Sequence, residues 1–268
     1  MASSGQVVPP FLRLAAHPLR WRLLTELAAG DLRVRELIEL VQAPQNLVSY
    51  HLRLLRDGGL VTATRSSSDR RDSYYRLDLD RCALALAATG AAVHPALRPA
   101  APPASPPGGA GRSRPAPPRA GRSRPAVLFA CSGNSARSPI AEALLRHHAG
   151  GRVTVTSAGS RPGPHLHPRA VGVLREEYGI DVSGRRPRHL DAVRGRRFDY
   201  VITLCDRVRE VCPDFGAQAR RVHWSTPDPA AAAAGESADA VFGRVAADLD
   251  RRVRHLLPVL DQIPEYRP

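Results

Sequence analysis

Hydrophobic positions recur at helical spacing in the first part of the chain. Between residues 9 and 57 apolar residues return every three or four positions, and the pattern breaks at His17-Pro18, at Gly30 and at Ala43-Pro44. Two short apolar runs then flank a polar tip that carries arginines, which is typical of a β-hairpin. We therefore expect two short helices within residues 9–29, helices at 34–41 and 46–57, and strands at 60–64 and 73–77.

From residue 125 onward, short apolar runs alternate with helical patterns. The runs predict strands at 127–130, 153–159, 199–204 and 221–224. Helices are expected to begin near Ser138 and at His167-Pro168, the second one ending at Gly179. Strands that alternate with helices are typical of an α/β domain with a doubly wound parallel sheet, and such sheets bind ligands at the carboxyl ends of their strands.

The stretch between the two regions has a composition that cannot bury a core. Residues 93–124 hold nine of the chain's 25 prolines, six arginines and no acidic residue, and they repeat the hexapeptide Gly-Arg-Ser-Arg-Pro-Ala. We expect a disordered Pro/Arg-rich linker that joins an N-terminal domain (1–92) to the α/β domain (125–268). Its arginines either add attraction to DNA phosphates or belong to a plain spacer.

Charge alone says little about function here. The formal net charge is +14, but all 39 basic residues are arginine, which indicates a compositional bias of the source genome. The four cysteines are too few and too unevenly spaced for a secreted disulfide scaffold, and no apolar run approaches the ~18 residues of a membrane span. We expect a cytoplasmic protein with no membrane contact, in which cysteines serve chemistry.

The fourth predicted helix presents polar side chains opposite its apolar positions. Amide, hydroxyl and guanidinium groups of this kind hydrogen-bond base edges and phosphates, and the hairpin tip adds further arginines. The predicted DNA-binding residues are Gln45, Asn46, Ser49, Tyr50 and Arg53 of the helix and Arg65, Arg70 and Arg71 of the wing. The alternative is a small helical module whose arginines are only a solvated face.

Residues 48–61 (VSYHLRLLRDGGLV) resemble the ArsR/SmtB family of repressors. The resemblance covers about residues 9–90 and implies a winged helix-turn-helix that binds operator DNA as a homodimer. Arsenite-sensing members of that family use clustered cysteines, often on the helix before the recognition helix, whereas residues 33–41 contain none and Cys82 is the one thiol of this region. The inducer and its site therefore stay open. His51 is interpreted as a packed residue and not as a metal ligand.

A loop of small and polar residues separates Cys131, at the end of the first buried strand, from Arg137, at the start of a helix. This spacing predicts backbone N–H groups that converge on a tetrahedral oxyanion above the sulfur, helped by the positive end of the helix. We expect these N–H groups and Arg137 to lower the pKa of the Cys131 thiol, and Ser138 to donate a hydrogen bond to it. The predicted oxyanion-binding residues are Ser132, Gly133, Asn134, Ser135, Ala136 and Arg137. The alternative is a strand-end cysteine that packs in the core.

The sequence CSGNSARS at 131–138 resembles the phosphate-binding loop of the low-molecular-weight phosphatase fold, and it is closer to the arsenate reductase branch than to the tyrosine phosphatases. Thr-Leu-Cys at 203–205 and Cys-Pro at 212–213 are similar to the three-cysteine, thioredoxin-coupled arsenate reductases. The resemblance implies reduction of arsenate to arsenite through Cys131, Cys205 and Cys212, with no tightly bound cofactor and a thioredoxin-like reductant as co-substrate. It also implies Asp228 as proton donor, since Asp228-Pro229 matches the family's general acid.

Three alternatives stay open at this level. Cys205 could be a buried core thiol and Cys212 an inert one, Asp228 an ordinary turn residue, and the second domain a sensor that binds an oxyanion without turnover. A tyrosine phosphatase is disfavoured because alanines at 230–234 stand where aromatic substrate clamps usually follow Asp-Pro, although residual phosphatase activity is expected. Family reductases also hold potassium; Asn134, Glu142 and Ser157 match that site, but its aspartate position falls near Arg188, so we expect no metal.

Overall fold

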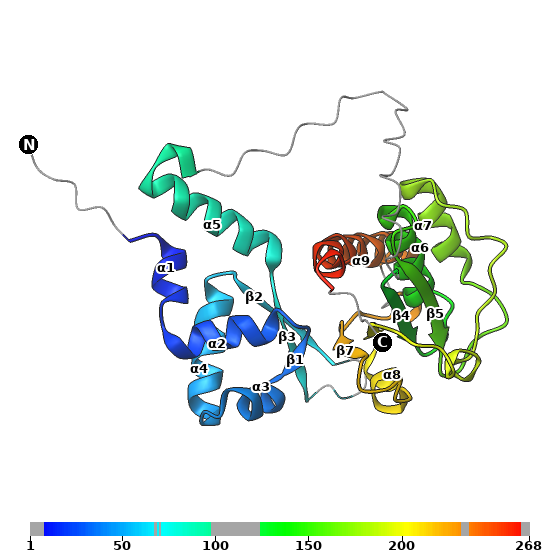
Figure 1. Cartoon of the computed structure of the whole chain (residues 1–268), viewed down its shortest axis with the longest axis horizontal. Coiled ribbons are helices and arrows are strands. Elements are labelled where there is room, and N and C mark those ends of the chain that lie inside the picture. The colour runs from blue at the N-terminus through cyan, green and yellow to red at the C-terminus, as the bar shows by residue number, and fades with distance from the viewer. Residues whose placement is uncertain (1–7, 67–68, 70, 98–123, 232–235, 264–268) are drawn as a thin grey trace, which may run out of the picture. The chain divides into compact units, whose positions relative to one another are not determined.

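The computed structural model describes residues 8–66, 69, 71–97, 124–231 and 236–263 (Figure 1). These residues form two compact units, one within residues 1–65 and 71–114 and the other within 66–70 and 115–268. The expected linker at 93–124 lies outside the described residues except for its two ends. None of the described helices combines the length and the apolar character that a membrane crossing needs.

The N-terminal unit has the expected winged helix-turn-helix order. Helix-breaking prolines and glycines separate its first helices at the predicted places. Its elements are α1 (Pro10–Ala15), α2 (Pro18–Leu27), β1 (Leu32–Arg33), α3 (Val34–Val41), α4 (Gln45–Asp57), β2 (Val61–Arg65), β3 (Ser73–Leu77), α5 (Leu79–Val93) and the 3₁₀ turn η1 (Pro95–Leu97). The four predicted helices and the hairpin are confirmed.

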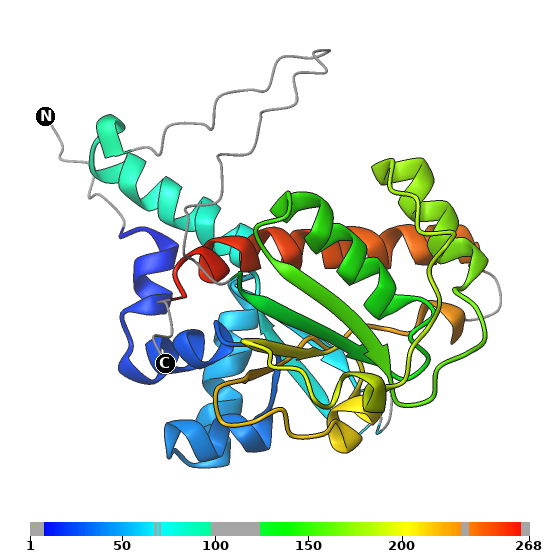
Figure 2. The same ribbon diagram turned by 45° about the vertical axis from the view of Figure 1, so that its right-hand side comes forward.

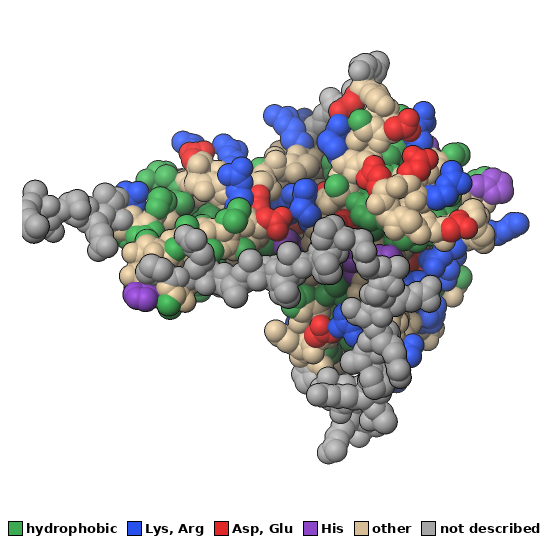
Figure 3. Space-filling view, turned by 90° about the horizontal axis from the view of Figure 1, so that it is seen from above, with side chains coloured by type: hydrophobic (Ala, Val, Ile, Leu, Met, Phe, Trp, Pro, Cys, Tyr) green, Lys and Arg blue, Asp and Glu red, His purple; other side chains and the backbone are tan. Residues whose placement is uncertain are grey.

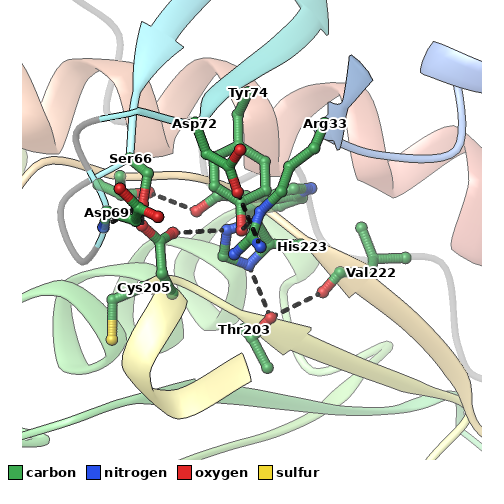
Figure 4. A network of polar contacts seen from close by, with 12 residues as sticks. Arg33, Ser66, Asp69, Asp72, Tyr74, Thr203, Cys205, Val222 and His223 are labelled. Atoms are coloured by element: carbon green, nitrogen blue, oxygen red, sulfur yellow. Dashed lines mark hydrogen bonds and ion pairs between the residues drawn. The ribbon is translucent and has the colours of Figure 1, made fainter. Parts of the chain in front are cut away.

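Strand β1 was not predicted, because two residues are too short to show an alternating pattern. It pairs antiparallel with β3, Leu32 opposite Tyr75 and Arg33 opposite Tyr74. The Nε of Arg33 donates to the hydroxyl of Tyr74 at 2.7 Å, and its guanidinium lies 3.1 Å from Asp72 (Figure 4). A buried arginine thus fastens the wing to the segment that leads into α3.

Helix α4 is held by its apolar face. Val48, Leu52 and Leu55 are fully buried in the core of the unit, where α2, α3 and β2 contact α4. The spacing of these three residues places them on one side of the helix and turns its polar residues away from the core. The burial therefore fixes which face is presented outward.

The C-terminal unit is a parallel sheet covered by helices. Its elements are β4 (Ala126–Cys131), α6 (Arg137–Ala149), β5 (Thr154–Gly159), α7 (Pro168–Tyr178), η2 (Leu190–Val193), β6 (Tyr200–Thr203), α8 (Asp206–Val211), β7 (Arg220–His223), η3 (Pro229–Ala231) and α9 (Ala238–Asp261). The strands run in the order β5-β4-β6-β7 and all pairs are parallel, so the predicted doubly wound sheet is confirmed.

The order of the strands locates the site. The chain moves from β4 outward to β5 and then crosses to β6 and β7, so the direction reverses between β4 and β6. Ligands bind at such a reversal, beyond the carboxyl ends of the strands. Cys131 ends β4, and Cys205 follows β6 after one residue, which brings both thiols to this point.

Helix α9 was not predicted from the sequence, although its apolar residues recur at helical spacing. Its buried residues return every three or four positions. It packs along α6 and α7, and Figure 2 shows these three helices grouped together with α8 apart from them. The long helix completes the cover of the core that carries β4.

Phe129, in the middle of β4, supplies a test of this core. Its side chain is fully buried and its ring lies 5.7 Å from that of Trp224. Phe129→Ala is expected to destabilise the C-terminal unit by about 3–5 kcal/mol, because the cavity cannot close fully. Amide hydrogen exchange read by mass spectrometry should show faster exchange throughout β4 to β7 and unchanged exchange in α4. Val259→Ala, at an exposed position of α9, is the control; equal protection in the two variants would contradict the assignment.

Candidate functional site

The loop between Cys131 and Arg137 is held in shape through its carbonyl groups. Backbone N–H groups of residues 160–167 donate to them: Ser160 to Cys131 (3.3 Å), Arg161 to Ser132 (2.8 Å), Gly163 to Gly133 (3.1 Å) and His167 to Ser135 (2.8 Å). Carbonyl oxygens that are bound on the outside of a tight loop leave its N–H groups to face inward. The loop that the sequence predicted as an oxyanion cradle therefore has the backbone support such a cradle needs.

Gly159, at the end of β5, is required for this loop and was missed as a site residue. A Cβ atom at this position would lie 2.5 Å from the Ser132 oxygen and 2.8 Å from the Asn134 nitrogen, both backbone atoms. Any other residue would push the loop away from the strand. The Ser-Ala-Gly sequence carried this signal, but the close approach is visible only once the two segments are in place.

Asn134 adopts the left-handed conformation, with φ of 44°, at the centre of the loop. Its amide nitrogen donates to the hydroxyls of Ser138 and Ser157, both at 2.9 Å, and its oxygen accepts the N–H of Arg188 at 2.8 Å. Three polar contacts thus hold a strained residue in place. Asn134, predicted as one of the oxyanion-binding residues, thus also braces the loop through its side chain.

Cys131 is 2% exposed, and its sulfur lies 2.9 Å from the hydroxyl oxygen of Ser138. The expectation of a lowered pKa is wrong for this structure: burial raises the pKa of the Cys131 thiol, while Arg137 and the Ser138 hydrogen bond pull it down. The sequence indicated the cationic neighbours but not the desolvation at the end of a buried strand. Ser138 and Arg137 therefore favour the Cys131 thiolate and offset part of the cost of burying its charge.

Arg137 and Asp228 form the mouth of the loop. The Arg137 guanidinium is 6% exposed, and it donates to the carbonyl of Thr226 at 3.1 Å and to the Asp228 carboxylate at 3.0 Å. Asp228, whose side chain is 42% exposed, stands just before η3. The structure thus places the predicted proton donor against the predicted anion-binding arginine.

Cys205 lies beside the loop, as its position at the same sheet edge predicted. Its sulfur is 3.3 Å from the Ser132 hydroxyl, and it precedes the first residue of α8. Cys212 is at the other end of α8, roughly 10 Å further along at 1.5 Å per residue. All four cysteines are free, and burial raises the pKa of the Cys212 thiol. Cys205 thus lies beside the loop that begins at Cys131, whereas Cys212 is separated from Cys205 by the length of α8.

A buried polar network lies next to Cys205. His223, at the end of β7, bonds the Thr203 hydroxyl through Nδ1 at 2.8 Å, and Thr203 also donates to the Val222 carbonyl (Figure 4). The Nε2 of His223 lies 3.2 Å from the carboxylate of Asp206, the first residue of α8. These contacts tie the Cys205 end of the helix to β6 and β7. Sequence reasoning missed both His223 and Asp206 as supporting residues.

A cavity of about 390 Å³ opens beside the loop. Residues from the loop, from the segment after β5, from η2 and from α8 line it. They include Ser132, Ser160, Arg161, His189, Asp191, Arg194, Arg207, Val211 and Pro213. Among the residues that the structure describes, no group of three or more His, Cys, Asp or Glu side chains is arranged to hold a metal ion.

The polar face of α4 carries the predicted DNA-binding residues. Gln45, Asn46, Tyr50 and Arg53 are exposed and Ser49 is half-buried. Arg65 ends β2 and Arg71 shortly precedes β3, both exposed, whereas Arg70 lies outside the described residues. His51 is buried against His17, with ring centroids 4.3 Å apart, as the packed interpretation expected. The α4 set therefore lies on one outward helix face.

Two other features of the N-terminal unit bear on partners. Burial and Asp78 raise the pKa of Cys82 to about 11, so this thiol is protonated at neutral pH. Helix α5 buries none of its side chains, and Leu84, Leu86 and Val93 are more than half exposed. Figure 3 shows hydrophobic side chains at the surface of the N-terminal unit. The apolar surface of α5 is thus available for contact.

Comparison with known proteins agrees with this geometry. Residues 126–265 match the model of the low molecular weight phosphotyrosine protein phosphatase family, and residues 17–63 match the bacterial regulatory protein arsR family. The chain belongs to the low molecular weight phosphotyrosine protein phosphatase family, with an ArsR-type helix-turn-helix before the phosphatase-like domain.

Within that family, curated relatives of the C-terminal unit include arsenate reductases. Those of Halalkalibacterium halodurans and Bacillus licheniformis are each 36% identical over 129 residues, which is 48% of this chain and 91% of the relative. Among solved structures, the thioredoxin-dependent arsenate reductase Cg_ArsC1' of Corynebacterium glutamicum is 33% identical, covering 52% of this chain and 62% of that chain with a TM-score of 0.41.

The contact between Ser138 and Cys131 can be tested directly. Ser138→Ala removes a hydrogen bond that favours the thiolate, so the pKa of Cys131 is expected to rise further. The rate of Cys131 alkylation by iodoacetamide, followed by peptide mass, should then need a higher pH to reach its half-maximum. Ser183→Ala, at an exposed position, should leave the profile unchanged. A Ser138→Ala profile that overlays the parent would rule out this role.

Proposed function

We propose that this chain is a bifunctional arsenic-resistance protein, in which a DNA-binding transcriptional regulator is fused to an arsenate reductase. The observation that carries the enzymatic part is the position of Cys205, whose sulfur lies 3.3 Å from the Ser132 hydroxyl, beside the loop that begins at Cys131. A phosphatase needs one thiol, whereas reduction of As(V) needs a second thiol within reach of the first. The names of the curated relatives support the same activity.

The first step uses the loop and its mouth. Arsenate enters among the loop N–H groups, and one of its oxygens takes the place of the Asp228 carboxylate on the Arg137 guanidinium. The Cys131 sulfur, stabilised as thiolate by Ser138 and Arg137, attacks arsenic and forms an S–As bond. An arsenate oxygen leaves as water, and Asp228, released from Arg137, donates the proton.

The second step is the reduction. The Cys205 thiolate attacks the Cys131 sulfur, the S–As bond breaks, and its electron pair goes to arsenic, which leaves as arsenite with As(III). The Cys131–Cys205 disulfide holds the two oxidising equivalents. Cys212 then attacks Cys205, which releases Cys131 as a thiol and moves the disulfide to Cys205–Cys212. A thioredoxin-like dithiol reduces that disulfide and completes the cycle.

Helix α8 has to unwind for this transfer. Cys205 and Cys212 stand at its two ends, and a six-residue helix keeps them too far apart for an S–S bond of about 2 Å. Asp206 and His223 hold the Cys205 end to the sheet, so we infer that the Cys212 end moves. Val211, which precedes Cys212, is 61% exposed and loses little packing when the last turn opens, whereas the buried Cys212 has to leave the core and its carbonyl has to give up the hydrogen bond from Arg221.

For the N-terminal unit we propose operator DNA as ligand and a homodimer as the active form. The exposed polar face of α4 supports base and phosphate contacts, and the match to the arsR family supports the docking of this helix in the major groove. The uncovered apolar side chains of α5 are suited to pairing with a second copy of the chain.

The thiol relay predicts a distinct behaviour for Cys212→Ser. With thioredoxin, thioredoxin reductase and NADPH, the parent protein is expected to oxidise NADPH when arsenate is added. Cys212→Ser should form about one arsenite per chain and then stop, because the disulfide cannot leave Cys131. Cys82→Ser is the matched control and should cycle normally. No arsenate-dependent NADPH oxidation by the parent would remove the reductase proposal, and phosphate-ester hydrolysis without it would favour the phosphatase.

DNA binding by α4 gives a separate prediction. Arg53→Ala is expected to weaken binding to the operator by about 1–3 kcal/mol, the scale of one base contact. Fluorescence anisotropy with DNA from the chain's own promoter region measures the change at fixed salt. Cys131→Ser and Arg251→Ala, both in the C-terminal unit, should bind like the parent. If Arg53→Ala also matched the parent, α4 would not be the recognition helix.

A further inference from the structure

Glu142, on α6, is a buried carboxylate in contact with two arginines. It is 3% exposed; its Oε2 accepts the Ser157 hydroxyl at 2.6 Å, and its Oε1 lies 2.6 Å from Arg146 and 2.9 Å from Arg185. A carboxylate at such a position costs several kcal/mol unless cations and hydrogen bonds compensate for lost water. Two guanidinium groups facing one carboxylate leave the cluster with a net positive charge.

This cluster is connected to the reacting thiol by a short series of hydrogen bonds. Ser157, which donates to Glu142, accepts a bond from the Asn134 amide at 2.9 Å. The same amide group donates to the Ser138 hydroxyl, and that hydroxyl lies 2.9 Å from the Cys131 sulfur. Any change in the charge at Glu142 is therefore passed to the loop through Ser157 and Asn134.

The residues that the family resemblance assigns to potassium do not fit that ion in this structure. A hard cation needs several oxygen atoms with lone pairs directed at one point. Here the Asn134 oxygen accepts the backbone N–H of Arg188, and the Ser157 hydroxyl points its hydrogen at Glu142. The Oε1 atom of Glu142 is already occupied by Arg146 and Arg185. The oxygen atoms of the set are thus committed to protein donors.

We propose that the guanidinium groups of Arg185 and Arg146 take the place of the cation and hold the active-site loop, so that this enzyme works without potassium. Arg146 is anchored to neighbouring structure as well as to Glu142. Arg146 also donates to the Val155 carbonyl of β5 at 2.8 Å, and Arg185 comes from the segment that follows α7. The cluster therefore joins α6, β5 and this segment around one carboxylate.

Arginine suits this task because its charge is permanent and its planar fork can meet two acceptors at once. A bound ion can leave when the surrounding salt changes, whereas a side chain cannot. The side chain of Arg185 is the less exposed of the two, at 32% against 49% for Arg146, and its segment is not part of a helix or strand. Removing its charge would leave Glu142 with one guanidinium and room for a small cation.

The proposal deepens the proposed function, on which it rests for the reaction, but the loop brace can be measured without arsenate. Three forms of the full chain are needed: the parent, Arg185→Gln and Arg185→Lys, with Arg186→Gln, one residue along and exposed, as matched control. For each form the pH profile of Cys131 alkylation by iodoacetamide is recorded in potassium chloride and in tetramethylammonium chloride at equal ionic strength. Arsenate-dependent NADPH oxidation is measured in the same two salts.

The parent and Arg186→Gln are expected to show the same alkylation profile and the same turnover in both salts. Arg185→Gln should be slower than the parent in tetramethylammonium by roughly tenfold, the scale of groups that support a reacting centre. Potassium should restore much of this loss, and Arg185→Lys should need less potassium because it keeps a charge. Recovery by an added ion separates the effect from simple misfolding.

Two results would overturn the proposal. One is a parent protein whose alkylation or turnover rises more than about twofold in potassium, since an occupied cluster has no place for the ion. The other is an Arg185→Gln variant that matches the parent in both salts. If the alkylation results follow the expectation while no form reduces arsenate, the brace stands and the reductase proposal fails. If the parent protein reduces arsenate but requires potassium, the reductase proposal stands and the proposed arginine brace fails.

Discussion

Hydrogen bonds between the backbone of residues 160–167 and the carbonyl groups of the loop after Cys131 are the interaction on which the C-terminal unit's chemistry depends. They turn the carbonyl oxygens outward and so leave the N–H groups for an anion. Gly159 permits the close approach of the two segments, and Asn134 adopts the left-handed conformation that the loop requires. Glu142, held by its two arginines, supports Asn134 through the hydroxyl of Ser157. The thiol, the loop and the supporting cluster are thus one continuous structure.

The second requirement is a thiol that can move while its neighbour stays fixed. Cys205 is fastened near the loop by the contacts of Asp206 with His223, whereas Cys212 ends a short helix next to an exposed valine. In the proposed relay, the side-chain contacts of Asp206 hold the Cys205 end, so the Cys212 end is the one that moves. A chain that shares only the phosphate-binding loop would lack this arrangement, which is why the site supports reduction more strongly than hydrolysis.

Local patterns predicted much of the fold and of the site, and non-local contacts explain most of what they missed. Prolines, glycines and apolar spacing placed α1 to α4 and the parallel strands, and the position of Cys131 and Cys205 after their strands predicted a shared edge. The requirement for Gly159 and the contact of Arg185 with Glu142 join segments far apart in the sequence. The pKa of Cys131 was misjudged because desolvation depends on the whole core. Helix α9 was an omission, since its periodicity is visible.

The support for the loop comes from main-chain N–H groups, and the two prolines of the supporting segment, at 162 and 164, fall between the donors. The side chains of this segment are therefore not needed to support the loop. The number of residues in the segment is, because it places the N–H donors. Over evolutionary time the composition around the cavity can drift, and with it the choice of substrate or reductant, provided that no residue is inserted or lost. A laboratory library that randomises these side chains at constant length could therefore diversify specificity without dismantling the catalytic centre.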